Sequence, residues 1–263
     1  MFPVGLFTSP HSRFCANYLA SSIANSINTS PYRDDLTRRS RSGSLRKGDK
    51  KRSGFLREMD IVNGFQLCDA RYRSAVTKGT ISGLFPADDG STVVSLFVSR
   101  SSRQLITAHV GDSRAVMVTL DDSFDLTCDH KPSNASEKER VELLGGRIIQ
   151  YGVLRVQGVL AVTRALGDFS LRPYVSNVPA VSFFDLTGRE CFAVLASDGL
   201  WDVMDHADVA SLLQEFVREV GVGKWWDVGA GDGGVCADAG GGGGAAAVDG
   251  QCGAWGGLRG RSR

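Results

Sequence analysis

The chain has 263 residues, of which 42% are hydrophobic, 22% charged and 8% aromatic, and 30 Lys plus Arg against 29 Asp plus Glu leave a formal charge of +1. A length of this order suits one large domain or two small ones, and it suffices to bury a sizeable core. The near-neutral balance argues against a protein that is basic along its whole length, as general phosphate-backbone binding would favour.

Apolar runs and cysteines indicate the compartment. The longest apolar stretches, such as residues 93–98, fall well short of the ~20 residues that cross a bilayer. The start of the chain shows no basic region followed by an apolar one, as a secretory signal does. The six cysteines include no Cys-x-x-Cys pair, which argues against a disulfide scaffold or a zinc site. We expect buried or idle thiols in an intracellular protein of the cytoplasm, the nucleus or both, without a membrane partner.

Two amphipathic helices are expected in the first third of the chain. Apolar side chains recur at helical spacing over residues 13–27 and again from 55 to about 78. Between them, residues 29–54 are polar and carry a dense run of Arg and Lys. Such a segment can bury too little apolar surface to offset the entropy that ordering costs. We therefore expect a disordered insertion there. It is either a solvated loop or a segment for nuclear import, phosphorylation or docking; nucleic-acid binding is disfavoured because no aromatic residues are interleaved.

The middle of the chain has a strand pattern. The short β-branched runs 92–98, 104–109 and 114–118 are separated by polar or Gly-containing turns, as in antiparallel strands. The turn at 111–113 has a length that suits a tight hairpin.

The second half of the predicted domain alternates between helix and strand. A helix is expected at 135–144, where Ser136 and Glu139 have capping-box spacing and Gly145 follows as a left-handed C-terminal residue. Strand-like runs follow at 148–154, 158–165 and 191–196. A last helix is expected at 207–217. From residue 221 to 263 the chain is Gly-rich and without periodicity, so we expect a flexible tail or sequence foreign to the domain.

Five polar segments carry the candidate chemistry, although each has a structural explanation when taken alone, as a turn or a bend. They are residues 88–92, 110–114, 129–134, 160–168 and 196–204. The last segment differs in context, because Asp198 directly follows the apolar strand 191–196 and Asp202 lies four residues further on. If the segment turns, both carboxylates face one hard cation, and Mg²⁺ and Mn²⁺ prefer carboxylate and water oxygens.

In their order and spacing, the five segments resemble the PP2C (PPM-type) family of metal-dependent protein serine/threonine phosphatases. The resemblance runs from about residue 4 to 217. It is most specific in two blocks, Val162-Thr163-Arg164-Ala165-Leu166-Gly167-Asp168 and Leu195-Ala196-Ser197-Asp198-Gly199-Leu200-Trp201-Asp202. It implies an α+β fold, an α-β-β-α sandwich of two antiparallel sheets flanked by helices, over residues 1–220.

The resemblance also implies a cofactor and a reaction. The family holds two Mg²⁺ or Mn²⁺ ions at one end of the sandwich, and a water activated by both ions attacks the phosphorus of phosphoserine or phosphothreonine. Carried over by position, Asp198 matches a metal ligand, Asp202 matches a ligand of a weaker additional site, and Asp88 is the counterpart of that site's other ligand, with Asp89 as the alternative. Arg164, Asp112 and Asp168 match positions that we interpret as structural.

Three departures from the family pattern bear on activity. Where the family has Asp-Gly-His-Gly-Gly before the first helix, Thr8 replaces the Asp that bridges the metals and Pro10 replaces the His. His11 is then the nearest substitute for a general acid, although a lone surface His at this place is more often incidental. The family's upstream Arg and acidic residue, its first strands and its final strand with the last metal Asp have no counterpart in this chain. We expect weak metal binding, and phosphoprotein turnover that is slow or absent.

Two hypotheses therefore stay open, an enzyme and a binding protein. The first is a PP2C-type phosphatase that acts on a phosphoprotein as a monomer. The second is a pseudophosphatase that keeps the sandwich as a docking surface for a protein partner.

Overall fold

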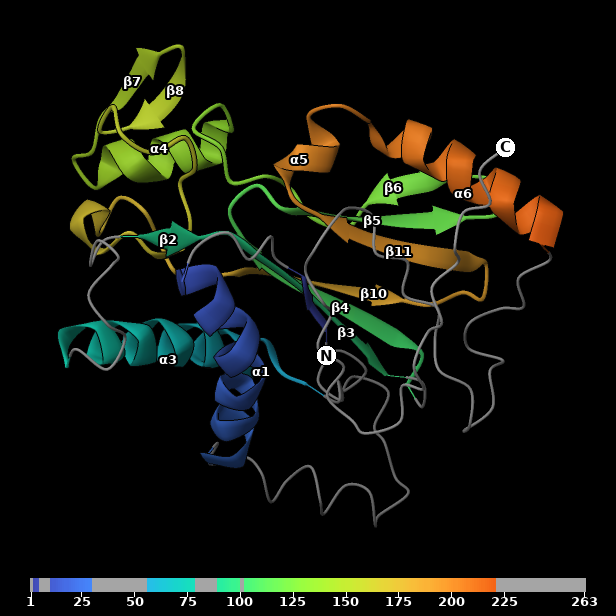
Figure 1. Ribbon diagram of the computed structural model, residues 1–263, viewed down its shortest axis with the longest axis horizontal. Coiled ribbons are helices and arrows are strands. Elements are labelled where there is room, and N and C mark those ends of the chain that lie inside the picture. The colour runs from blue at the N-terminus through green and yellow to red at the C-terminus, as the bar shows by residue number, and fades with distance from the viewer. Residues whose placement is uncertain (1, 5–9, 30–55, 79–88, 100–101, 221–263) are drawn as a thin grey trace, which may run out of the picture.

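The computed structural model of the chain describes residues 2–4, 10–29, 56–78, 89–99 and 102–220. Their backbone forms two layered antiparallel sheets with helices over both outer faces (Figure 1). This arrangement confirms the predicted α-β-β-α sandwich. The expected insertion and the Gly-rich tail lie outside the described residues, except that Thr29 ends the first helix, α1 (Pro10–Thr29).

The first sheet has the strand order β1-β3-β4-β10, and all its neighbours are antiparallel. Its strands are β1 (Phe2–Val4), β3 (Val93–Ser99), β4 (Gln104–Val110) and β10 (Ala180–Asp185). Successive side chains of a strand point to opposite faces. On β3, Val93 and Phe97 therefore pack toward the helices, and Val94 and Leu96 pack toward the second sheet. A strand buried on both faces explains the unbroken apolar run of this segment.

The second sheet has the order β11-β5-β6. Its strands are β5 (Arg114–Thr119), β6 (Ser123–Asp125) and β11 (Glu190–Ala196). Ala115 and Met117 share a core cluster with residues of the first sheet, whereas Val116 and Val118 pack with Ala210 of the last helix, α6 (His206–Val220). Each β5 face is therefore covered, one by the facing sheet and one by a helix.

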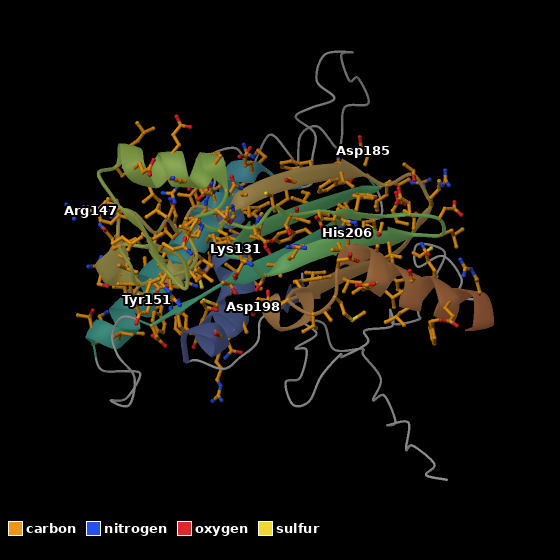
Figure 2. All side chains as sticks on the ribbon, turned by 90° about the horizontal axis from the view of Figure 1, so that it is seen from above. Lys131, Arg147, Tyr151, Asp185, Asp198 and His206 are labelled. Atoms are coloured by element: carbon orange, nitrogen blue, oxygen red, sulfur yellow. The ribbon has the colours of Figure 1, made fainter. Side chains whose placement is uncertain are left out.

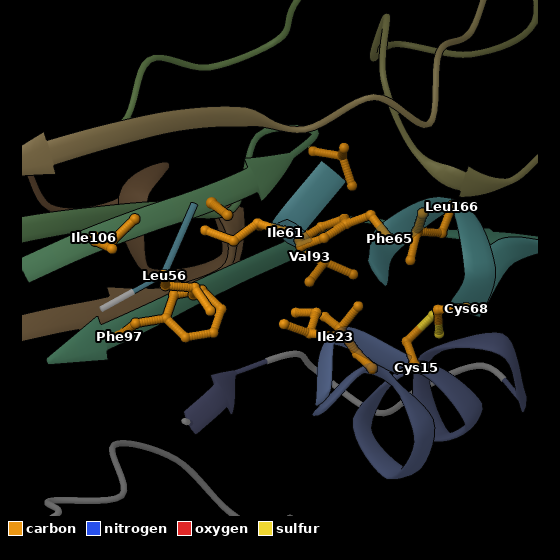
Figure 3. Packing of buried hydrophobic residues seen from close by; sticks show 13 residues of the cluster. Cys15, Ile23, Leu56, Ile61, Phe65, Cys68, Val93, Phe97, Ile106 and Leu166 are labelled. Carbon is orange, nitrogen blue, oxygen red and sulfur yellow. The ribbon is translucent and has the colours of Figure 1, made fainter. Parts of the chain in front are cut away.

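The outer face of the first sheet is covered by α1 and α3 (Glu58–Thr77). Figure 3 shows Ile23 of α1 and Phe65 of α3 in the cluster that also contains Phe97. The two thiols of Cys15 and Cys68 lie side by side in this interface, both buried and free, in agreement with the expectation of buried thiols. A hydrogen bond with Cys68 and burial raise the pKa of Cys15 well above its usual value, so Cys15 does not have the setting of a nucleophile.

Smaller elements complete the domain. Residues Gly90–Ser91 (β2) pair with Leu166–Gly167 (β9), and Ile148–Tyr151 (β7) pairs with Val153–Val156 (β8). The remaining helices are α4 (Ala135–Leu143), the 3-10 helix η2 (Phe169–Leu171) and the short α5 (Asp198–Trp201). Among the helices of the described residues, none has both the length and the apolar character needed to span a membrane.

The prediction of a tight hairpin at residues 111–113 is wrong. β4 pairs with β3 and β10, whereas β5 pairs with β11 and β6, so the turn crosses from one sheet to the other. The backbone at Gly111 has φ +93°, and a Cβ there would lie 2.3 Å from Cγ2 of Thr92. Short length and turn residues suit both a hairpin and a crossover, and only the pairing of the flanking strands distinguishes them.

Three further local expectations require correction. Residues 158–165 form no strand, since Leu160 makes only an isolated bridge to Val156. The run 148–154 is a hairpin that turns at Gly152, where φ is +68°. The N-cap of α4 is Asn134, whose side chain accepts a hydrogen bond from the Ser136 backbone N–H, so the Ser136–Glu139 capping box does not form. The strands β1, β2, β6, β9 and β10 were not expected.

Candidate active site

Asp198 lies where β11 leaves the second sheet. The strand pairs with β5 up to Ala196, opposite Arg114, and Ser197 then takes an extended conformation before the single turn of α5. The indole Nε1 of Trp201 donates a hydrogen bond to the carbonyl of Ala196 at 2.9 Å, which holds the turn against the end of the strand. Asp198 is exposed at the start of this turn. The sequence expectation of a carboxylate at a strand end is therefore confirmed.

The crossover turn brings a second carboxylate toward Asp198. Asp112, whose side chain is 14% exposed, lies 3.7 Å from Nζ of Lys131, and that amine lies 3.5 Å from Oδ2 of Asp129. Burial raises the pKa of the Asp112 carboxyl; Lys131 opposes this shift, while the nearby negative charge of Asp198 adds to it. Asp129 is in turn held by Arg114 through two hydrogen bonds of 3.0 Å. This end of the sandwich thus presents a mixed-charge surface in which Lys131 compensates the largely buried carboxylate of Asp112. Figure 2 shows Lys131 and Asp198 at this end.

The described side chains do not assemble a metal centre. Asp202 is exposed and caps the C-terminus of α5, one turn after Asp198, with its N–H donating to the Asp198 carbonyl at 2.8 Å. Asp88 lies outside the described residues. Within the described ranges, no three or more His, Cys, Asp and Glu side chains are arranged to hold an ion. A divalent site needs several oxygen ligands, so the residues that the structure describes do not fit Mg²⁺ or Mn²⁺ by themselves.

Two stacked imidazoles lie beneath the crossover turn. The rings of His109 and His130 have centroids 4.3 Å apart and an interplanar angle of 14°. The Gly111 N–H donates to Nδ1 of His130 at 3.2 Å, and the His130 N–H donates to the Gly111 carbonyl at 3.0 Å. Burial, followed by the proximity of His109, lowers the pKa of His130 to about 3. A neutral imidazole is therefore the acceptor that fixes the turn carrying Asp112.

A buried ion pair fixes the segment that contains Arg164. The Glu137 side chain, 5% exposed, accepts hydrogen bonds from Arg164, from Arg140 and, at 2.7 Å, from the hydroxyl of Thr163. Burial by itself raises the pKa of Glu137, but the bonds from Arg164 and Thr163 outweigh burial and lower the pKa to about 2. These contacts join α4 to the loop before β9, which agrees with the structural role expected for Arg164.

His11 lies in the interior, and the expectation of a surface histidine is wrong. Its ring stacks on Tyr72 with centroids 3.7 Å apart, and Nδ1 donates to the Asp89 carbonyl at 3.0 Å. The Tyr72 hydroxyl donates to Asp89 Oδ1 at 2.5 Å. The ring also packs against Gly167, where a Cβ would lie 2.3 Å from Cε1 of His11. Burial lowers the pKa of His11, so it packs as a neutral side chain between α3 and the β2–β9 pair; its role as a general acid stays a prediction.

Comparison with known proteins decides the family. A sequence model of the family described as "Protein phosphatase 2C" matches residues 12–221. The chain belongs to this family. "Probable protein phosphatase 2C 8" of Oryza sativa subsp. japonica is 42% identical over 135 residues, which cover 50% of this chain and 33% of that relative. "Protein phosphatase 2C 53" of the same organism is 42% identical over 152 residues, or 58% of this chain and 34% of the relative.

Solved structures agree with the protein phosphatase 2C fold. A Caenorhabditis elegans sex determining protein superposes with a TM-score of 0.62 at 28% identity, over 82% of this chain and 46% of that one. The serine-threonine phosphatase 2C from Toxoplasma gondii superposes with a TM-score of 0.62 at 22% identity, over 78% of this chain and 70% of that one. At this identity the second comparison supports the fold alone. The matches to the two rice relatives span about a third of each relative's length.

The sequence did not indicate the residues that hold the loops around Asp112 and Arg164 in place. Lys131 and His130 were interpreted as part of a polar bend, and Glu137 was not singled out. The available indication was their crowding within a few positions of Asp129. Because their partners lie far away in the chain, at residues 109–114 and 163–164, the contacts depend on the sheet crossover that the sequence did not predict.

Proposed function

We propose that this domain binds proteins phosphorylated on serine or threonine and hydrolyses the phosphate ester, the reaction class of the protein phosphatase 2C family. The observation that carries the proposal is the Ser197-Asp198-Gly199 segment at the open end of β11, within a sandwich that the family model matches over residues 12–221. Lys131 supplies a cation at the same end, 3.7 Å from Asp112.

Metal dependence is general in this family, and Asp198 is the described side chain that we assign to the metal face. Among the described residues, no group of His, Cys, Asp and Glu side chains is arranged to hold an ion, and Lys131 already pairs with Asp112. We therefore expect slow turnover by this chain.

A second candidate, a phosphoprotein-binding scaffold, is favoured by the same lack of a metal-binding group among the described residues. A scaffold needs the sandwich and its mixed-charge end, but not the ions. It predicts that a phosphopeptide binds without being hydrolysed.

The test is phosphate release from a phosphothreonine peptide in the presence of Mn²⁺, with binding of the phosphorylated and unphosphorylated peptides measured in parallel. We expect slow release that stops in Asp198→Ala and persists in Glu142→Ala, a control on the exposed face of α4. Binding of the phosphopeptide without release supports the scaffold instead. Equal binding of both peptides, with no release, contradicts both candidates.

A further inference from the structure

Two thiols meet in the interface between α1 and α3, the helices that cover the outer face of the first sheet. Cys15 is 3% exposed and Cys68 is fully buried, and both are free. A hydrogen bond joins their side chains, and Figure 3 shows the two sulfur atoms facing each other. Of the other described cysteines, Cys128 is exposed and Cys191 is half-buried. The packing of the two helices thus brings together two thiols from distant parts of the chain.

The contacts on either side of the thiol pair show how closely the two helices approach. One turn before Cys15, the His11 ring of α1 stacks on Tyr72 of α3 with centroids 3.7 Å apart. Two turns after Cys15, a Cβ added at Gly64 of α3 would lie 2.7 Å from Cα of Ile23. The two helices are therefore antiparallel and in contact on both sides of the pair. Side chains one helical turn apart lie on the same face of a helix, so the thiol pair belongs to this row of contacts.

This arrangement suits a disulfide bond, which needs two Cβ atoms about 3.5–4.5 Å apart. The helix contacts on both sides, together with the hydrogen bond between the thiols, leave the two sulfur atoms a short distance to cover. The surroundings are apolar, since Leu19, Phe65 and Leu166 belong to the same core cluster. A disulfide has no N–H or O–H group that burial would leave without a partner, so its formation adds no unpaired polar group to this cluster.

A bond between these sulfur atoms would change how α1 is attached to the domain. It would close a loop that contains residues 16–67, and the closure of so long a loop removes conformational freedom from the unfolded chain. One turn from Cys15, the His11 ring donates a hydrogen bond to the Asp89 carbonyl at 3.0 Å, so α1 also holds the segment that leads into β2. The oxidised chain should therefore keep α1 and this segment in place at temperatures that release them in the reduced chain.

We propose that Cys15 and Cys68 form a redox-sensitive bond between α1 and α3, which a peroxide closes and a thiol such as reduced glutathione opens. The proposal goes beyond the hydrolytic function and does not rest on it, because neither cysteine belongs to the Asp198 segment. In a reducing compartment such a disulfide is transient and responds to oxidation. It would couple the attachment of a covering helix to the redox state of the surroundings.

The reaction balances with one molecule of hydrogen peroxide. The thiolate of one cysteine attacks a peroxide oxygen and becomes a sulfenic acid, and the other oxygen leaves as water with the proton of the thiol. The sulfur of the second cysteine then displaces the hydroxyl group as a second water, and the S–S bond forms. In total the two sulfur atoms lose two electrons and two protons. Burial and the raised pKa of Cys15 keep its thiolate scarce, so the bond forms slowly, under sustained oxidation.

The test maps the disulfide in the full chain after timed exposure to hydrogen peroxide. The remaining thiols are blocked with N-ethylmaleimide in denaturant before digestion with trypsin. Trypsin places Cys15 in peptide 14–33 and Cys68 in peptide 58–71, and each peptide contains a single cysteine. We expect mass spectrometry to find these two peptides joined, with a mass that is two hydrogens below their sum. Treatment of the oxidised chain with reduced glutathione should separate them again.

Thermal melting supplies a second readout. Peroxide should raise the melting midpoint of the wild type by roughly 5–15 °C, and it should leave the midpoints of Cys15→Ala and Cys68→Ala unchanged. The melts of these variants without peroxide check that each is folded. Cys128→Ser and Cys191→Ser are matched controls at described cysteines outside the pair. Both controls should give the joined peptides and the same increase as the wild type.

Three results would overturn the proposal. The first is that peptides 14–33 and 58–71 stay separate after prolonged exposure to peroxide. The second is that Cys15 pairs with Cys68 no more often than in the urea-unfolded chain, because the pairing would then owe nothing to the helix interface. The third is a melting midpoint that peroxide leaves unchanged in the wild type, or raises equally in Cys15→Ala.

Discussion

The buried imidazole of His130 makes the stability of the domain depend on pH in a predictable direction. Its ring is stacked on His109 and accepts the Gly111 N–H, and its pKa in the folded chain is about 3, against 6.5 for a free side chain. Because the folded pKa lies below the unfolded one, the unfolded state binds more protons between these values. The free energy of unfolding must therefore fall as the pH decreases below about 6.5.

The magnitude follows from the two pKa values. At pH 5 the unfolded imidazole is almost fully protonated and the folded one is neutral, whereas at pH 7 both are mostly neutral. Integration over this interval assigns a loss of about 2 kcal/mol to His130. The substitution His130→Asn retains an acceptor near the position of Nδ1 for the Gly111 N–H, and it removes the titration.

Urea denaturation at pH 7 and pH 5 provides the measurement. We expect the decrease in unfolding free energy between these pH values to be about 2 kcal/mol smaller in His130→Asn than in the wild type. His206→Asn removes a partly exposed imidazole beside Asp125 and is the matched control. An identical pH dependence in His130→Asn and the wild type would show that His130 is accessible to protons in the folded chain, contrary to its stacked, buried position.

Three further substitutions test the packing around the site. Glu137→Ala removes the carboxylate that pairs with Arg164 and Arg140, and it should lower the unfolding free energy in urea by about 3–5 kcal/mol. Glu139→Ala, at an exposed position of the same helix, is the control. A loss below about 1 kcal/mol in Glu137→Ala contradicts the buried ion pair. Gly111→Ala should destabilise the fold more than Gly152→Ala, since both residues have positive φ but only Gly111 has an atom within 4 Å of the added Cβ; equal losses in thermal melts would rule out the close packing on Thr92. Phe65→Ala should lower the unfolding free energy in urea by about 3–5 kcal/mol. A loss as small as that of Val203→Ala, at an exposed position, would contradict the place of Phe65 in the core.

The helices and the principal strands were predictable from local patterns. Residues 13–27 and 55–78 have helical apolar spacing, and α1 and α3 occupy these segments. The continuous apolar runs of β3, β4 and β5 indicate strands buried on both faces. In these elements each residue's own neighbours in the chain determine its environment, so periodicity alone is informative.

The partners of these strands were not predictable in the same way. A turn of three residues links β4 to β5 in different sheets, and the edge strand β6 has only three residues. For the site, Asp198 was identified because it follows an apolar strand. The burial of His11 was not foreseen, because it depends on Tyr72, Asp89 and Gly167, which approach it from distant parts of the chain.

Calorimetric titration of Mn²⁺ into the purified chain, with Asp198→Ala alongside, tests the central claim about the metal face. We expect weak binding, with a dissociation constant of about 1 mM or larger, because the described carboxylates form no group that holds an ion. Micromolar binding by the wild type that disappears in Asp198→Ala would contradict it, and would mean that this face carries a complete metal centre.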